Sequence, residues 1–106
     1  MNPVYEMRMY HAGPGKMDAL LSRFAHHSDA LLQRHQLKPI AYWMDYPKNL
    51  LIYIIEHASV EAAERNWSEF RNDPEWQKIK AETDADGPLA ATIDRNFMEK
   101  VDLSRY

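Results

Sequence analysis

Two β-prone stretches separated by only three residues restrict the fold of this chain more than any other feature. The segments "LKPIAYWMDY" (residues 37–46) and "LLIYIIEH" (residues 50–57) are rich in aromatic and branched apolar residues, and only "PKN" stands between them. So short a connection joins neighbouring antiparallel strands. Pro39 falls near the start of the first strand or on a sheet edge, where a missing N–H is tolerated. The sequence therefore predicts an antiparallel hairpin near the middle of the chain.

The segments on either side of this hairpin carry strand and helix patterns in turn. The opening "YEMRMYHAGPGK" (residues 5–16) alternates two sets of side chains before a turn rich in glycine and proline. Apolar residues at helical spacing then predict one long helix over roughly residues 15–35. After the hairpin, "VEAAERNWSEF" (residues 60–70) and "DPEWQKIKAE" (residues 73–82) predict two helices. A last strand is predicted in "ATIDRNFMEKV" (residues 91–101).

Two of these helices begin with capping signals. Ser59 precedes the second helix, but Ala62 stands where a capping box needs glutamate or glutamine, so we expect the serine to cap alone. Asp73 and Pro74 are a favoured N-cap and a favoured first helical residue. This pair predicts that the third helix is separate and short.

The order strand, helix, strand, strand, helix pair, strand is that of a ferredoxin-like α+β fold. We predict a single domain over residues 1–106, with a four-stranded antiparallel sheet and helices on one face. The uncovered face must then meet water, a ligand or a second subunit.

Strand alternation divides the side chains between the two faces, and giving the more apolar set to the helices decides the direction. On this rule Tyr5, Met7 and Met9 lie under the helices, as do Leu50, Ile52 and Ile54. The uncovered face then carries Glu6, Arg8, Tyr10, Leu51, Tyr53, Ile55 and His57, and we add Trp43 from the second strand. The last strand is ambiguous.

This uncovered face is too apolar for water alone, so it predicts an interface or a ligand groove. Two copies packed sheet to sheet would form a homodimer, a dimeric α+β barrel that encloses a partly polar cavity. We expect that cavity to bind a small organic molecule through Glu6, Arg8, Tyr10, Trp43, Tyr53 and His57. Arg8 would orient an anionic or carbonyl group. The alternative is a structural or interaction module whose uncovered face serves only dimerisation.

The same residues also have purely structural explanations. Glu6 and Arg8 lie two positions apart on one strand face, so they bind an anionic substrate or pair with each other. Tyr10 and Tyr53 act as acids or hydrogen-bond donors, or they pack as amphipathic rings. His57 binds ligand or is an ordinary hydrogen-bonded histidine. Trp67, Phe70 and Trp76 recur at helical spacing and are expected in the core.

Composition and spacing argue against several classes of function. Thirteen basic and 16 acidic residues give a net charge of −3 without any charged block, so neither nucleic acid nor a membrane is expected as a partner. The chain has no cysteine, and His27 and His35 are too far apart on one helix to share an ion, so we predict no metal and no cofactor.

His11 and His57 are expected at the same end of parallel neighbouring strands, on opposite faces. The opening resembles no export signal, which favours a cytoplasmic location.

Several of these segments together resemble the NIPSNAP family. "YEMRMYHAGPGK" is similar to the family's opening strand and turn, "DPEW" to the start of its helix, and "MDALLSRFAHHSDALLQRH" and "LKPIAYW" also fit. The resemblance runs from Tyr5 to about Arg95. It implies a dimeric α+β barrel but no established reaction. Related barrels include cofactor-independent oxygenases and simple binding proteins, so whether the chain is an enzyme stays open.

Overall fold

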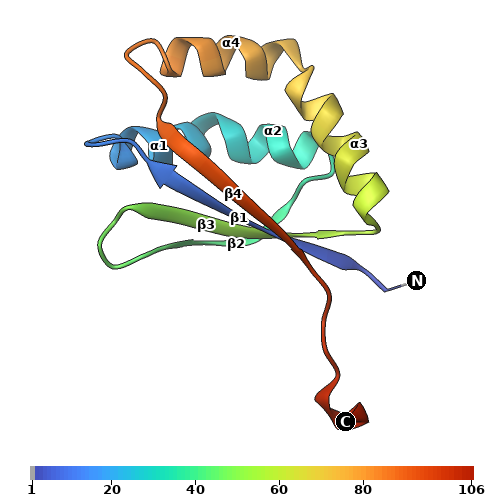
Figure 1. Ribbon diagram of the computed structural model, residues 1–106. Helices are drawn as coiled ribbons and strands as arrows, with labels where there is room; N and C mark the ends of the chain where they lie inside the picture. Colours follow the sequence, from blue (N-terminus) through green and yellow to red (C-terminus); the bar gives the residue numbers. More distant parts are fainter. Residues whose placement is uncertain (1) are drawn as a thin grey trace.

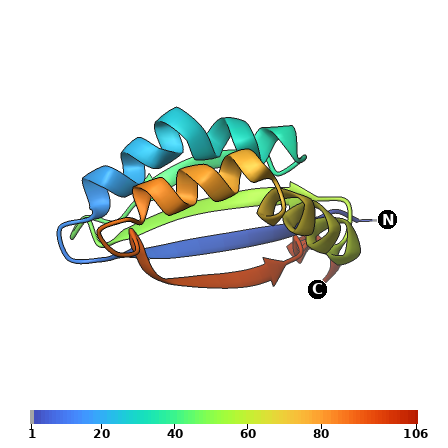
Figure 2. The same ribbon diagram turned by 90° about the horizontal axis from the view of Figure 1, so that it is seen from above.

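The computed structural model describes residues 2–106 and has the predicted ferredoxin-like α+β architecture. One antiparallel sheet has the strand order β2-β3-β1-β4. The strands are β1 (Val4–Ala12), β2 (Pro39–Met44), β3 (Leu50–His57) and β4 (Ala90–Met98), and the helices are α1 (Met17–Arg23), α2 (Asp29–Arg34), α3 (Val60–Arg71) and α4 (Pro74–Thr83). All four helices lie on one side of the sheet (Figure 1). Figure 2 shows the α1–α2 run and α4 side by side above the strands.

The long helix predicted over residues 15–35 is present but contains a change of pitch. A π-helical turn, Phe24–Ser28, connects α1 to α2 without breaking the run of helical backbone. Such turns are rare, and they occur often at functional sites. Here the turn places both of its end residues, Phe24 and Ser28, in the buried layer above the sheet.

The predicted helix caps and hairpin are confirmed. Ser59 Oγ accepts a hydrogen bond from Ala62 N at 3.0 Å, and Asp73 Oδ1 accepts one from Glu75 N at 2.9 Å. Pro39 is the first residue of β2, which is an edge strand. Each of these residues therefore stands where its backbone chemistry is favourable.

The predicted direction of the first and third strands is wrong. β1 and β3 are antiparallel neighbours, with Val4 opposite His57 and His11 opposite Leu50. The reason is topological: β3 pairs antiparallel with β2 in the hairpin and lies between β2 and β1, antiparallel to both. His11 and His57 therefore lie at opposite ends of β1, although they do lie on opposite faces as expected.

The two faces of the sheet are also exchanged relative to the prediction. We call the helix-covered side the inner face and the other side the outer face. Glu6, Tyr53 and Ile55 are fully buried on the inner face. The inner face carries Glu6, Arg8, Tyr10, Leu51, Tyr53, Ile55, His57, Ile93, Arg95 and Phe97. The outer face carries Tyr5, Met7, Met9, His11, Trp43, Leu50, Ile52, Ile54, Glu56, Thr92, Asp94, Asn96 and Met98.

Candidate functional site

A buried carboxylate organises the inner face. Glu6 Oε1 accepts hydrogen bonds from Trp67 Nε1 and from His57 Nε2, both at 2.8 Å, and Glu6 Oε2 accepts one from Arg8 at 3.1 Å. Burial alone would raise the pKa of Glu6, but the hydrogen bonds from His57 and Trp67 and the charge of Arg8 hold it below its ordinary value. The group is thus an ionised carboxylate. Because an ionised carboxylate only accepts, His57 Nε2 carries the proton of their hydrogen bond.

This network explains why the sequence rule failed for β1. We expected a heavy desolvation cost for Glu6 and Arg8 beneath the helices, because an unpaired buried charge is expensive. The structure gives both groups partners from distant parts of the chain, including Trp67 on α3 and His57 at the end of β3. A fully paired charge can be accommodated in the interior, so the polar set of β1 faces inward.

Arg8 connects the carboxylate to a pair of tyrosines. Its guanidinium lies 4.1 Å from the ring centroid of Trp67, and Arg8 Nε donates to Tyr53 Oη at 3.2 Å. The hydroxyls of Tyr10 and Tyr53 are 2.7 Å apart. Burial disfavours the charge on Arg8, but the tyrosine oxygens and Glu6 raise its pKa, and burial raises the pKa of Tyr53 well above its ordinary value. The cluster therefore combines a fixed cation with neutral phenols.

A second polar cluster lies across from Arg8, on the helical layer. Arg23 donates from one terminal nitrogen to Thr83 Oγ1 at 3.1 Å and to Asp84 Oδ1 at 2.9 Å. Its Nε is buried and has no hydrogen-bond partner within residues 2–106, and the same holds for Ser28 Oγ. These two atoms are polar groups in the interior whose hydrogen-bonding capacity the described chain does not use.

The two clusters border one cavity, which we call the inner pocket. It has a volume of about 170 Å³ and lies between the sheet and the helices. Its apolar lining comes from Phe24, Leu32, Trp67, Phe70, Trp76 and Ile93. Its polar lining comes from Arg8, Tyr10, Arg23, Ser28, Arg71 and Lys80. A largely aromatic wall with a few placed polar groups is the usual composition of a small-molecule site.

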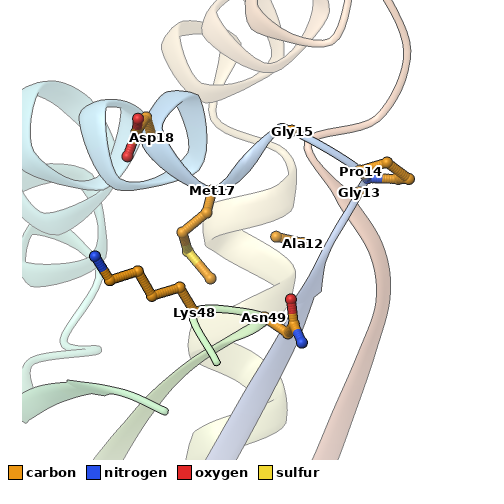
Figure 3. A pocket seen from close by; sticks show the side chains of 8 residues that line it. All are labelled: Ala12, Gly13, Pro14, Gly15, Met17, Asp18, Lys48 and Asn49. Carbon is orange, nitrogen blue, oxygen red and sulfur yellow. The ribbon is translucent and has the colours of Figure 1, made fainter. Parts of the chain in front are cut away.

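A larger hollow of about 350 Å³ lies at the turn between β1 and α1 (Figure 3). The charged side chains there, Asp18 and Lys48, are exposed, and the rest of the lining is mostly the loop Ala12–Gly15. Water competes strongly for polar groups in such a position. The inner pocket is therefore the better candidate site.

The residues predicted to bind ligand are distributed unevenly about this pocket. Glu6, Arg8, Tyr10, Tyr53 and His57 do come together, but beneath the helices and not in a space between two sheets. Only Arg8 and Tyr10 of this group line the pocket, while Glu6, Tyr53 and His57 support them from behind. The prediction that the cavity lies on the uncovered face is wrong for these residues.

Trp43 was predicted on the uncovered face, and that placement is confirmed. It pairs with Ile52 on the outer face and is 48% exposed. It is therefore separated from the inner pocket by the sheet.

Sequence reasoning missed Arg23 and Ser28, and it assigned Trp67 to the core alone. The helical spacing does mark Arg23 and Ser28 as unusual. Arg23 and Ser28 fall on the same stripe as Leu20, Phe24 and Leu31, so each is a polar residue at a position where helical periodicity predicts an apolar one.

Among residues 2–106, no group of three or more histidine, cysteine, aspartate or glutamate side chains is arranged to hold a metal ion. None of the helices in the described part of the chain has the length and apolarity needed to span a membrane.

Comparison with known proteins places this chain in a family. The NIPSNAP family model matches residues 5–105. The chain belongs to the NIPSNAP family. The match confirms the resemblance noted in the opening strand, the first helix and the "DPEW" segment.

Solved NIPSNAP structures have the same fold at low sequence identity. A NIPSNAP family protein of unknown function from Agrobacterium tumefaciens is 19% identical, with a TM-score of 0.81 over 94% of this chain and 89% of the other. A NIPSNAP-like domain protein from Burkholderia xenovorans is 17% identical, with a TM-score of 0.83 over 95% and 87%. A dimeric ferredoxin-like protein from an uncultured marine organism is 13% identical, with a TM-score of 0.66 over 96% and 90%. No curated protein sequence matches this chain significantly.

Proposed function

We propose that this NIPSNAP chain binds a small organic molecule in the inner pocket. The observation that supports the proposal is the pairing of a cavity of about 170 Å³ with two buried polar atoms, Arg23 Nε and Ser28 Oγ, that have no partner within residues 2–106. An unsatisfied buried polar group costs about 1–3 kcal/mol. A ligand that pairs with these atoms, after the side chains that cover them move aside, would remove that cost while its apolar part contacts the aromatic wall.

The homodimer expected from the sequence stays part of the proposal, now through the outer face. Trp43 is 48% exposed there, next to partly exposed Met7, Met9, Ile52 and Ile54. A contiguous apolar surface of this kind is typical of an interface. The ferredoxin-like relative described as dimeric adds support for a second copy of the chain as the partner.

Ligand binding is tested by native mass spectrometry of freshly purified protein together with a thermal-shift screen of small organic compounds. A bound compound should raise the melting temperature, because any native-state ligand stabilises the fold by mass action. Ser28→Leu should fill the pocket and abolish the shift, whereas Ser22→Leu, the same change at an exposed position of α1, should leave it intact. A shift that survives Ser28→Leu unchanged would place the ligand elsewhere.

Dimerisation is tested by sedimentation velocity at micromolar concentration. Ile52→Asp should put an unpaired charge into the interface and weaken association by several kcal/mol, while Ala81→Asp on the exposed side of α4 should not. Ile55→Asp would disturb the core instead, because Ile55, which the sequence places on the uncovered face, is fully buried on the inner face. A monomeric wild type would end the dimer proposal.

The alternative is a non-enzymatic interaction module whose outer face serves only dimerisation. A dimer that binds no compound in the screen would favour it. Cofactor-independent oxygenase-like chemistry and a cytoplasmic location stay predictions from the sequence.

A further inference from the structure

We infer that the inner pocket selects an aromatic organic anion, a single ring carrying one short carboxylate arm. This inference rests on the proposed function of the pocket and adds the chemical class of its ligand. Three independent features of the lining support it: its charge, its aromatic walls and its unused donors.

The charge of the lining is strongly positive in a chain whose net charge is −3. Four cationic side chains line the pocket, Arg8, Arg23, Arg71 and Lys80, and none of the lining residues is acidic. Two carboxylates pair with these cations from outside the lining. Glu6 lies 3.1 Å from Arg8, and Asp84 is shared between Arg23 and Lys80 at 2.9 and 3.0 Å.

Four positive charges against two negative ones leave an excess of two around the pocket. Arg71 has no ion-pair partner within residues 2–106. The attraction of such an excess for an anion is strongest near the buried Arg23 and weaker near the exposed Arg71 and Lys80, whose charge water screens. An anionic ligand would therefore be favoured over a neutral one of the same shape.

The walls of the pocket fit one aromatic ring. The rings of Phe70 and Trp76 lie 4.8 Å apart between centroids, and those of Trp67 and Phe70 lie 5.5 Å apart. Aromatic rings favour offset or edge-to-face contact with one another. A cavity of ~150 Å³ holds benzene in another protein, and the volume here is about 170 Å³. One ring with a short arm is the size that fits.

The unused donors give the anion a place to bind after the side chains that cover them move aside, because neither atom is exposed to the pocket in this structure. Arg23 Nε–H can only donate, and the hydroxyl of Ser28 can donate or accept. A carboxylate offers two acceptor oxygens, and charge-assisted hydrogen bonds are roughly twice as strong as neutral ones. A neutral amide could pair with these groups, but it would leave the excess positive charge uncompensated.

The test compares phenylacetate with phenylacetamide, which have nearly the same shape but differ in charge. Isothermal titration calorimetry at low ionic strength should give a dissociation constant about tenfold lower for the carboxylate. Added salt should weaken the binding of phenylacetate but not that of phenylacetamide. A thermal-shift measurement with the same two compounds provides a second readout.

A matched pair of arginine variants locates the effect. Arg71 and Arg65 are both exposed on α3, but only Arg71 lines the pocket. Arg71→Gln should weaken phenylacetate binding about fivefold without changing phenylacetamide binding. Arg65→Gln should change neither, because its charge is outside the pocket.

The outcomes separate this inference from the proposed function. Equal binding of the two compounds, or preference for the amide, would overturn the anion class and leave a small-molecule pocket standing. Equal effects of Arg71→Gln and Arg65→Gln would show that the ligand responds to the charge of the whole surface and not to the pocket. That result would also overturn the anion class. Failure of both compounds and of every compound in the wider screen would overturn the pocket's function itself.

Discussion

The two faces of the sheet contain the same kind of histidine–carboxylate contact in opposite surroundings. On the inner face His57 Nε2 lies 2.8 Å from Glu6, and both side chains are buried. On the outer face His11 Nε2 lies 2.8 Å from Asp94, and both are substantially exposed. Around the first pair stand Arg8 and Trp67, whereas around the second stand apolar strand residues such as Met9. The inner face therefore adds a charged network to the apolar core, whereas the outer face leaves apolar side chains partly exposed beside polar ones such as Asp94 and Glu56.

The proposed ligand pocket would use the network of the inner face, and the proposed dimer would use the partly exposed apolar residues of the outer face. A buried network contributes little stability over a well-packed apolar core, but it fixes side chains in one geometry. Here it holds Arg8 and Tyr10 at the edge of the inner pocket. The outer face is the surface proposed above for a second copy of the chain. The predictions below test whether substitutions on the two faces change the free energy of unfolding by different amounts.

The largest effect should come from removing the central carboxylate. Glu6→Ala leaves Arg8, His57 and Trp67 without their shared acceptor and should lower the free energy of unfolding by about 3–5 kcal/mol. Urea denaturation gives the value. Glu64→Ala breaks only the exposed pair with Arg95 and should cost no more than about 1 kcal/mol. Similar losses at the two positions would mean that the inner network is not buried.

The double change Glu6→Met with Arg8→Met sharpens the same point. Removing both charges should recover part of the loss, because a single substitution leaves the other charge unpaired. Recovery will be incomplete, since His57 and Trp67 still lack an acceptor. If the loss in the double variant equals the sum of the losses in Glu6→Met and Arg8→Met, the two charges are not coupled.

The two histidines allow a direct comparison of the faces. His57→Asn should lower the free energy of unfolding by about 1–3 kcal/mol, because it removes a donor to a buried carboxylate. His11→Asn should change it by less than about 0.5 kcal/mol, because both groups of that pair are exposed. Thermal or urea unfolding of the two variants in parallel measures the difference, and equal effects would contradict the assignment of faces.

A smaller effect should appear in the pH dependence of stability. The pKa of Glu6 is lower in the folded protein than its ordinary value of 4.5, so its contribution is fully present above that pH. The contribution is lost as the pH falls through the lowered pKa, when the folded protein must take up the proton. The stability difference between wild type and Glu6→Gln should therefore shrink below pH 4.5 at up to about 1.4 kcal/mol per pH unit. A constant difference from pH 7 to pH 3 would argue against an ionised Glu6.

Local signals in the sequence were sufficient for the elements and their order. The short "PKN" connection determined the hairpin, and Ser59, Asp73 and Pro74 marked where helices begin. These features act through backbone chemistry within a few residues, so no distant contact is needed to interpret them.

The direction of the faces could not be predicted in the same way. Alternation separates Leu51, Tyr53 and Ile55 from their neighbours in β3, but the other set is equally hydrophobic. The choice of the face that lies under the helices then depended on Glu6 and Arg8. The position of Glu6 depends on His57 and Trp67, which are 51 and 61 residues away. A burial rule that treats each charge alone assigns them to the wrong side.

The pocket was missed for a related reason. Arg23 and Ser28 are polar residues on an apolar helical stripe, so helical spacing marks them as unusual. It does not predict the π-helical turn that ends at Ser28, nor the cavity that both residues line.

The central claim is that the charged side of the sheet lies under the helices. Its most direct test uses Ile54→Cys and Ile55→Cys, adjacent positions of β3 in a chain without other cysteines. The rate of reaction with a thiol reagent is measured over a range of protein concentrations. Ile55→Cys should react at least about a hundredfold more slowly at every concentration, because that thiol is exposed only when the fold opens. Ile54→Cys should react rapidly in dilute protein and more slowly as dimers form. Faster reaction of Ile55→Cys than of Ile54→Cys would contradict the account.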